Sequence, residues 1–195
     1  MADERSHGAL HPHPIRGILF TLLEQFASMK LGRPTYEQVR SACPVKTREP
    51  FEPGETYPFE DFLAILKGVV EALKVSRDEA LREFGVFSFP KFAGLFPAYV
   101  VRYPHPKEFL LAVDSIIHAE VGKRFKGAVP PRITCKDPSS NRLVMEYHSQ
   151  RGLCSFMEGL IQGVAEVFKS PIRCKHTRCR HRGDAACEFD LRFSK

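Results

Sequence analysis

The last third of the chain gathers thiol and imidazole side chains at spacings typical of metal ligands. Cys174, His176, Cys179 and Cys187 lie within 14 residues, and Cys154 starts the helix predicted before them. Thiolates and imidazoles suit Zn²⁺, and four such ligands make a closed tetrahedral site, usually a structural one. Because Cys174 and His176 share a strand face, spacing alone leaves five candidates for four places. The alternative is reduced cysteines packed in a small sheet, and we favour the metal site.

A second set of polar side chains recurs at every other residue: Tyr147, Ser149 and Arg151. If this segment stays extended, the three project from one face, each about 6–7 Å from the next. A guanidinium binds carboxylates and phosphates with two hydrogen bonds, and hydroxyl groups add neutral donors. The row therefore suits an anionic ligand. Taken by itself, the motif favours a polar strand edge at the surface.

His118 is the third candidate, inside a helix predicted over 107–124. The neighbour one heptad before it is Leu111, so its face of the helix is largely apolar. A single histidine on such a face is more often a hydrogen-bonded core residue than a ligand. Neutral imidazole is nevertheless the commonest metal ligand, and an apolar wall is what the face of a haem requires.

Composition excludes several classes of protein. The chain has 195 residues, of which 43% are hydrophobic and 27% charged, so it is globular rather than disordered. It contains no membrane-spanning run and no secretory signal, and we expect a cytoplasmic location. The net charge of +6 comes from basic residues interleaved with acidic ones, so we expect neither nucleic acid nor membrane as a partner. A zinc-stabilised nucleic-acid binder would rest on charge alone.

The elements that must position these candidates change character along the chain. Apolar residues at helical intervals and helix-breaking Gly and Pro residues predict helices over 15–31, 35–42, 58–73 and 76–85. Ser76 begins a capping box for the last of these. Residues 86–107 contain four prolines and are predicted to be irregular, and residues 45–57 to be a loop.

The second half combines helices with short strands. Helices are predicted over 107–124 and 153–168, and strands over 132–136, 143–151, 171–178 and 186–193. Gly159 and Gly163 in the later helix allow a neighbouring element to approach closely. The predicted fold class is α+β, with a helical N-terminal half packed on a C-terminal half that contains a small antiparallel sheet.

These three constellations coincide in one known family. The chain resembles the haem-nitric oxide/oxygen binding (H-NOX) domains through IRGILFTLLEQF (15–26), DEALREFGVF (78–87), IIHAEVGKRFKGAVPPR (116–132) and YHSQRGLCSFMEGLIQGVAEVF (147–168). The last segment contains the family's Y-x-S-x-R signature. The resemblance implies haem b with His118 as the axial iron ligand. It also implies that Tyr147, Ser149 and Arg151 bind the haem propionates and that Pro131 presses on the porphyrin and distorts it.

The cysteine cluster resembles that of a zinc-containing bacterial subgroup of this family. In that subgroup a helix cysteine joins a His-x2-Cys-x7-Cys motif. The matching positions are Cys154, His176, Cys179 and Cys187. The resemblance therefore implies Zn²⁺ at these four residues, with Cys174 as a possible substitute for Cys154.

The resemblance also implies which gas binds. O₂ on ferrous haem is polar and requires a hydrogen-bond donor, which oxygen-binding members supply as a tyrosine. The matching residue is Phe156, and the other residues expected on the distal side, Leu19 and Leu23, are apolar as well. We therefore expect a sensor of NO (and CO) that excludes O₂.

The expected organisation is a flexible tail over 1–14 and a single haem-binding domain over 15–195. Its helical distal part would span about 15–87 and its α+β proximal part about 107–195. No catalytic constellation is recognisable, so we do not expect an enzyme. The expected output is a switch acting on a separate signalling protein, such as a histidine kinase or a diguanylate cyclase. The alternative is a zinc/thiol redox sensor that acts independently of haem.

Overall fold

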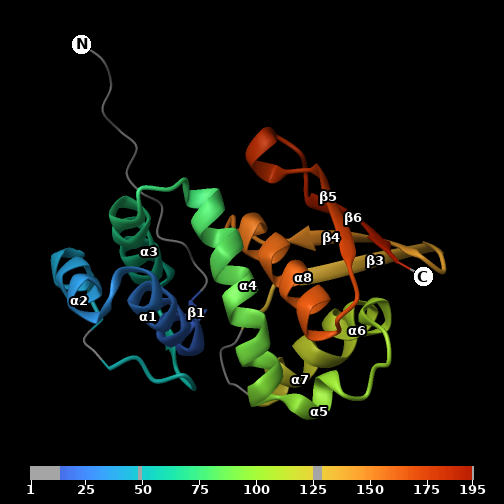
Figure 1. Cartoon of the computed structure of the whole chain (residues 1–195), viewed down its shortest axis with the longest axis horizontal. Coiled ribbons are helices and arrows are strands. Elements are labelled where there is room, and N and C mark those ends of the chain that lie inside the picture. The colour runs from blue at the N-terminus through green and yellow to red at the C-terminus, as the bar shows by residue number, and fades with distance from the viewer. Residues whose placement is uncertain (1–13, 48–49, 125–128, 195) are drawn as a thin grey trace.

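The structure is a computed structural model, and it describes residues 14–47, 50–124 and 129–194. The predicted tail over 1–14 lies outside the described residues except for Pro14. Two long helices, α4 (Arg77–Leu95) and α8 (Cys154–Val167), lie side by side in the middle of the molecule (Figure 1). The first three helices pack on one side of this pair, and a four-stranded sheet lies on the other.

The N-terminal helices surround an aromatic core. They are α1 (Gly17–Leu31), α2 (Arg33–Ala42) and α3 (Phe59–Leu73). A short antiparallel pair, β1 (Ile15–Arg16) and β2 (Thr56–Tyr57), ties the start of α1 to the segment before α3. The core includes Phe20, Phe26, Phe62 and Phe84, and also Phe156 from α8. The two halves of the sequence therefore share this core, because α8 contributes to it from the C-terminal half.

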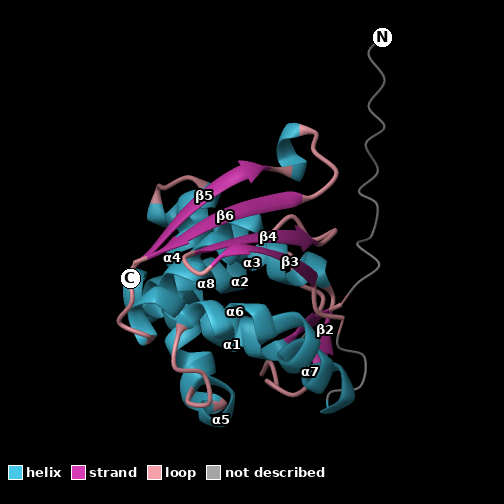
Figure 2. Cartoon of the chain, turned by 90° about the vertical axis from the view of Figure 1, so that its right-hand side faces the viewer, coloured by secondary structure: helices cyan, strands magenta, loops and turns pink. Residues whose placement is uncertain are grey.

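The C-terminal sheet is antiparallel, in the order β3-β4-β6-β5. Its strands are β3 (Arg132–Ser139), β4 (Arg142–His148), β5 (Ile172–Arg178) and β6 (Cys187–Phe193), and a short 3₁₀ helix, η2 (Arg180–Arg182), joins β5 to β6. Figure 2 shows the four strands stacked in this order above the helices. Alternate residues of β4 and β6, such as Met145 and Phe189, are buried against α8. The mixture of helix and sheet confirms the predicted α+β class.

The helix predicted to end near Gly85 continues to Leu95, so this prediction was wrong. Gly85 does not end α4 because it is a packing contact: a Cβ on Gly85 would lie 2.4 Å from the carbonyl oxygen of Phe156. Gly159 is equally tight, with its added Cβ 2.0 Å from the carbonyl oxygen of Arg82. Pro90 lies inside the helix, where a proline usually costs about 3 kcal/mol. Pro90 itself is exposed, whereas Gly85 and Phe89 of the same helix are buried and pack against α8, which keeps α4 continuous.

Two other elements differ from expectation. The single helix predicted over 107–124 is divided into α6 (Pro106–Ala112), a π-helical turn, η1 (Val113–His118), and α7 (Ala119–Arg124). The irregular segment after α4 contains one short helix, α5 (Pro97–Val100). The Ser76 cap is confirmed, since its hydroxyl accepts the amide of Glu79 at 3.2 Å. Among the described residues, no helix is both long and apolar enough to cross a membrane.

Candidate haem cavity and metal cluster

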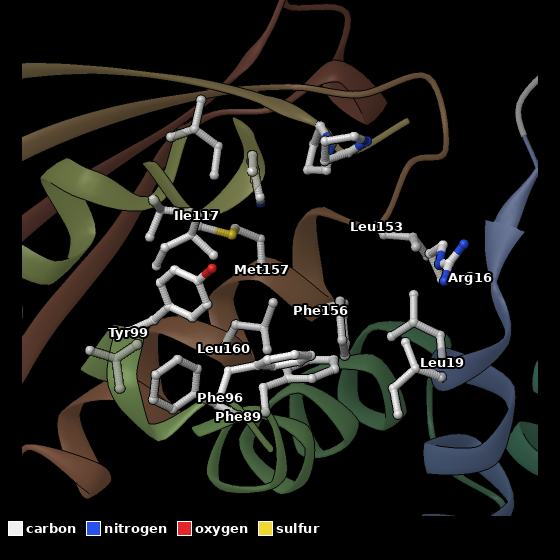
Figure 3. Close-up of a pocket in the computed structure, with 18 of the residues that line it drawn as sticks. Arg16, Leu19, Phe89, Phe96, Tyr99, Ile117, Leu153, Phe156, Met157 and Leu160 are labelled. Atoms are coloured by element: carbon white, nitrogen blue, oxygen red, sulfur yellow. The ribbon is translucent and has the colours of Figure 1, made fainter. Parts of the chain in front are cut away.

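A cavity of about 540 Å³ lies where the two halves meet, within the usual size range of ligand pockets. Its walls are mainly apolar and come from α1, α4, α6, η1 and α8. Figure 3 shows Leu19 and Arg16 at one end, Tyr99 and Phe96 at the other, and Phe156 and Leu160 between them. Of the residues predicted for the haem site, the cavity includes His118, Pro131, Tyr147, Arg151, Phe156 and Leu19.

Two predicted residues do not line the cavity. Leu23 lies one turn after Leu19 on the same face of α1 and is fully buried in the N-terminal core. Ser149 follows the end of β4, and its hydroxyl accepts the amide of Arg151 at 3.2 Å. The extended row expected for Tyr147, Ser149 and Arg151 is therefore interrupted, because β4 ends at His148 and the chain turns. The turn still directs Tyr147 and Arg151 toward one cavity.

His118 ends the π-helical turn η1 and lines the cavity. Burial lowers the pKa of its imidazole, while Asp114 and the backbone of Pro131 partly oppose this effect. The ring is therefore neutral at pH 7, which is the form that binds metals. Its Nδ1 atom is buried and has no hydrogen-bond partner among the described residues. The nearest carboxylate oxygen, on Asp114, is 3.6 Å away and accepts the amide of Ile133 at 2.7 Å.

Arg151 carries a positive charge into the edge of the cavity. Its two terminal nitrogens donate to the carbonyl oxygens of Val129, at 2.9 Å, and Pro14, at 2.7 Å. Within the part of the chain that the structure describes, its Nε atom is buried without a partner, and burial lowers the pKa of the guanidinium. Burial likewise raises the pKa of the neighbouring Tyr147 to about 12, against the opposing effects of Ser149 and Arg151. A neutral phenol and an under-bonded cation fit the carboxylates of a haem.

The residues of the cavity therefore fit haem in two respects. Its apolar walls match the faces of a porphyrin, and its few polar groups are an imidazole for iron and donors for carboxylates. Sequence reasoning missed Arg16, whose guanidinium donates to the carbonyl oxygen of Gly54, and Tyr99, whose hydroxyl points into the cavity (Figure 3). It also missed the π-helical turn, a feature frequent at functional sites. No pattern in the sequence signals the position of Tyr99 or the π-helical turn.

The metal cluster forms at the end of the sheet where Tyr147 of β4 pairs with Cys187 of β6. Ligand atoms of Cys154, His176, Cys179 and Cys187 all lie within 4.8 Å of one another. The four residues come from three elements that meet here: Cys154 begins α8, His176 lies in β5, Cys179 follows β5 and Cys187 begins β6. Cys174, the fifth candidate, is exposed and outside this group.

Two details of the cluster fit a cation. The Nδ1 atom of His176 lies 2.5 Å from a carboxylate oxygen of Glu158, and its buried Nε2 atom has no partner in residues 14–47, 50–124 and 129–194. A carboxylate on the second nitrogen is the usual support of a metal-binding histidine. Burial raises the pKa of Cys154, and the nearby Cys187 and Cys179 raise it further. A bound cation removes this like-charge penalty by stabilising thiolates.

A sequence profile described as haem-NO-binding matches residues 16–176. The fold and the cavity thus define a haem-sensor class of protein, and the chain belongs to the haem-NO-binding family. H-NOX domains of this family bind haem and act as gas sensors rather than as enzymes. No curated protein matches the chain.

Solved structures of H-NOX proteins share the fold. An H-NOX protein from S. oneidensis in the Fe(II)NO state has a TM-score of 0.87 and 24% identity, over 93% of this chain and 100% of that chain. The H-NOX domain from Shewanella oneidensis in the Fe(II)CO state has a TM-score of 0.84 and 24% identity, over 93% and 99%. An unliganded Fe(II) H-NOX protein from K. algicida has a TM-score of 0.82 and 23% identity, over 93% and 97%.

Proposed function

We propose that the protein is a haem-based gas sensor that binds NO and CO at a ferrous haem b, excludes O₂ and regulates a signalling protein in trans. The observation that carries this proposal is the partly buried imidazole of His118, whose pKa burial lowers, on the wall of an apolar cavity that also includes Arg151. Family membership and the NO and CO states of related structures support it.

Each residue has one role in this proposal. His118 binds the iron, Tyr147 and Arg151 bind the haem carboxylates, and Ser149 positions Arg151 by accepting its amide. Pro131 packs against the porphyrin and distorts it. Leu19 and Phe156 line the gas-binding side, and Leu23 lies one turn further along α1 in the core. The haem, when bound, supplies the iron atom to which NO and CO bind.

Gas selection depends on hydrogen-bond donors near the iron. Phe156 has no hydroxyl, and its ring is stacked on Phe84 with the centroids 4.9 Å apart. An apolar wall leaves O₂ without the donor that stabilises it, whereas NO and CO need none. Tyr99 is the other aromatic side chain to test, since its hydroxyl points into the same cavity.

Absorption spectra of the ferrous protein test the proposal. We expect a Soret band with one haem per chain, which shifts with NO and with CO and does not become that of an oxygenated form in air. An oxygenated spectrum in air would contradict O₂ exclusion. If that spectrum disappears in Tyr99→Phe, Tyr99 is the donor.

Phe156→Tyr is the complementary gain-of-function variant. A hydroxyl at this position adds a donor worth about 1 kcal/mol, so we expect O₂ binding to become measurable. Phe156→Leu is the matched control, because it alters volume without adding a donor. If Phe156→Tyr behaves like Phe156→Leu, Phe156 does not face the bound gas.

The output we propose is a shift of the segment that carries His118. His118 ends η1, and Asp114 in the same turn accepts the amide of Ile133 in β3. A displacement of the imidazole therefore passes both into α7 and into the sheet. A histidine kinase or a diguanylate cyclase that binds the surface formed by α7 and the sheet would respond to the shift.

We further propose that Cys154, His176, Cys179 and Cys187 bind Zn²⁺, which joins the start of α8 to the ends of β5 and β6. Thiolate and imidazole ligands match zinc, and the carboxylate of Glu158 behind His176 matches the support such a ligand needs. Metal analysis of the purified protein tests this, with one zinc per chain expected.

A zinc/thiol redox sensor is the second candidate function. The Sγ atoms of Cys154 and Cys179 are 3.8 Å apart, so a small movement would permit a disulfide. Hydrogen peroxide would accept two electrons from two metal-bound thiolates, giving a disulfide and two hydroxide ions, and the metal would be released. Zinc release by peroxide from protein that takes up no haem would favour this function over gas sensing.

A further inference from the structure

The loop that carries Cys179 contacts the turn that carries Arg151. A side-chain nitrogen of Arg180 donates to the carbonyl oxygen of Ser149 at 3.0 Å. The Nε2 atom of His181 lies 3.1 Å from the carbonyl oxygen of Gly152. A carbonyl oxygen only accepts hydrogen bonds, so Nε2 of His181 carries the proton. Two side chains of the loop over 179–186, called the cluster loop here, therefore bind the backbone on both sides of Arg151.

The contact at Gly152 is close packing as well as a hydrogen bond. Gly152 has φ +61°, and a Cβ at this position would lie 2.8 Å from the Cε1 atom of His181. The imidazole therefore lies directly on the backbone of the turn. Any displacement of the cluster loop would remove this packing together with both hydrogen bonds.

The conformation of the cluster loop depends on its sulfur atoms. The amide of Arg180 lies 3.5 Å from Sγ of Cys187. The amide of Cys179 donates to Asp184 at 2.7 Å, and the amide of Asp184 donates back to the carbonyl oxygen of Cys179 at 3.2 Å. Because Arg180 directly follows Cys179, a metal bound to these sulfurs would restrict the backbone from which Arg180 and His181 extend.

We propose that Arg180 and His181 are positioning residues. They couple metal binding at the cluster to the binding of the haem carboxylates by the Tyr147–Arg151 turn. Metal bound at the cluster keeps the turn in the geometry that binds haem, and loss of metal accelerates loss of haem. By thermodynamic reciprocity, haem binding also tightens metal binding. This inference rests on the proposed haem and zinc sites, and it adds the physical connection between them.

Haem transfer to excess apomyoglobin measures the coupling. The wild-type protein, Arg180→Ala/His181→Ala and Arg178→Ala are compared, each with zinc bound and after removal of zinc by a chelator. Arg178 is the matched control, because Arg178 and Arg180 are the two arginines next to Cys179. Within the described residues, Arg180 makes a hydrogen bond to the turn and Arg178 makes none. Two lost hydrogen bonds correspond to about tenfold in rate.

We expect zinc removal to accelerate haem loss about tenfold in the wild type and in Arg178→Ala. The double variant should lose haem rapidly with or without zinc. Arg180→Lys keeps a cationic donor and should restore part of the zinc dependence. The resonance Raman bands of the haem propionates should change on zinc removal in the wild type and not in the double variant.

If zinc removal changed the rate of haem loss equally in the double variant and in the wild type, the proposed coupling by these side chains would be overturned. A zinc affinity of the wild type that is unchanged by haem would overturn it too, a measurement that requires no variant. A protein that binds no zinc overturns the inference but leaves gas sensing intact. A protein that takes up no haem overturns the proposed function itself, so the two failures are distinguishable.

Discussion

The cavity and the metal cluster share α8 but are constructed differently. The cavity spreads its contacts over apolar side chains from both halves, and His118 is the only histidine among the described residues that line it. The cluster concentrates its binding groups in four ligand atoms within 4.8 Å, all from the C-terminal half. Affinity for a large apolar cofactor is distributed over many contacts, whereas affinity for an ion depends on each ligand.

This difference predicts unequal sensitivity to substitution. Single changes in the cavity wall, such as at Leu160 or Met157, remove a few of many contacts and leave a cavity. Any change at Cys154, His176, Cys179 or Cys187 removes one of four ligands. His118 is the exception in the cavity, because no other described residue of the cavity offers an imidazole to iron.

His118→Gly should have the largest effect. It removes the proposed iron ligand, so we expect haem affinity to fall at least about 100-fold and to recover when imidazole is added. Haem titration followed by the Soret band measures this. His148→Gly is the control, since His148 lies on β4 outside the cavity. Normal haem uptake by His118→Gly without imidazole would contradict the assignment.

Cys187→Ser and Cys174→Ser should separate the cluster from its exposed neighbour. Cys187→Ser removes a buried ligand, and we expect zinc affinity to fall by about 100-fold or more. Cys174→Ser should retain one zinc per chain, because Cys174 is exposed and outside the cluster. Competition with a chromogenic chelator measures both. Loss of zinc in Cys174→Ser would place Cys174 among the ligands.

Glu158→Gln should weaken the cluster without removing a ligand. The carboxylate accepts the Nδ1–H of His176 and so directs Nε2 toward the cluster. Loss of such a partner typically lowers metal affinity about 10–100-fold. Glu166→Gln, on the exposed face of the same helix, is the control and should bind zinc normally. Equal affinities of the two variants would mean that Glu158 does not orient His176.

Asp114→Asn should have the smallest effect, and it tests the cavity. The asparagine oxygen still accepts the amide of Ile133, so the change removes the charge and keeps the hydrogen bond. Because Asp114 raises the pKa of His118 against the larger effect of burial, its removal lowers that pKa further and weakens the imidazole as a donor to iron. We expect the iron–histidine stretching band of the ferrous protein to move to lower frequency. An unchanged band would mean that Asp114 has no influence on the ligand.

Local sequence patterns predicted a large part of the fold. Ser76 caps α4 as its hydroxyl predicts, and the strands β5 and β6 lie within the predicted ranges. The end of α4 was missed because Gly85, which is a breaker in isolation, packs against Phe156 of a helix some seventy residues later. Long-range burial of this kind leaves no signal in the neighbouring residues.

The sequence by itself determined which side chains were available for chemistry, since His176-x2-Cys179-x7-Cys187 and Tyr147-x-Ser149-x-Arg151 are properties of spacing within one segment. Spacing left Cys154 and Cys174 both open and the family resemblance favoured Cys154, whereas the tertiary structure brings Cys154 into the cluster and leaves Cys174 outside, because that choice depends on how α8 packs against β5 and β6. The end of β4 at His148 and the contact of Arg180 with the turn after it are decided in the same way. Spacing fixes positions along one element, whereas contacts between elements follow from burial of surfaces distant in sequence.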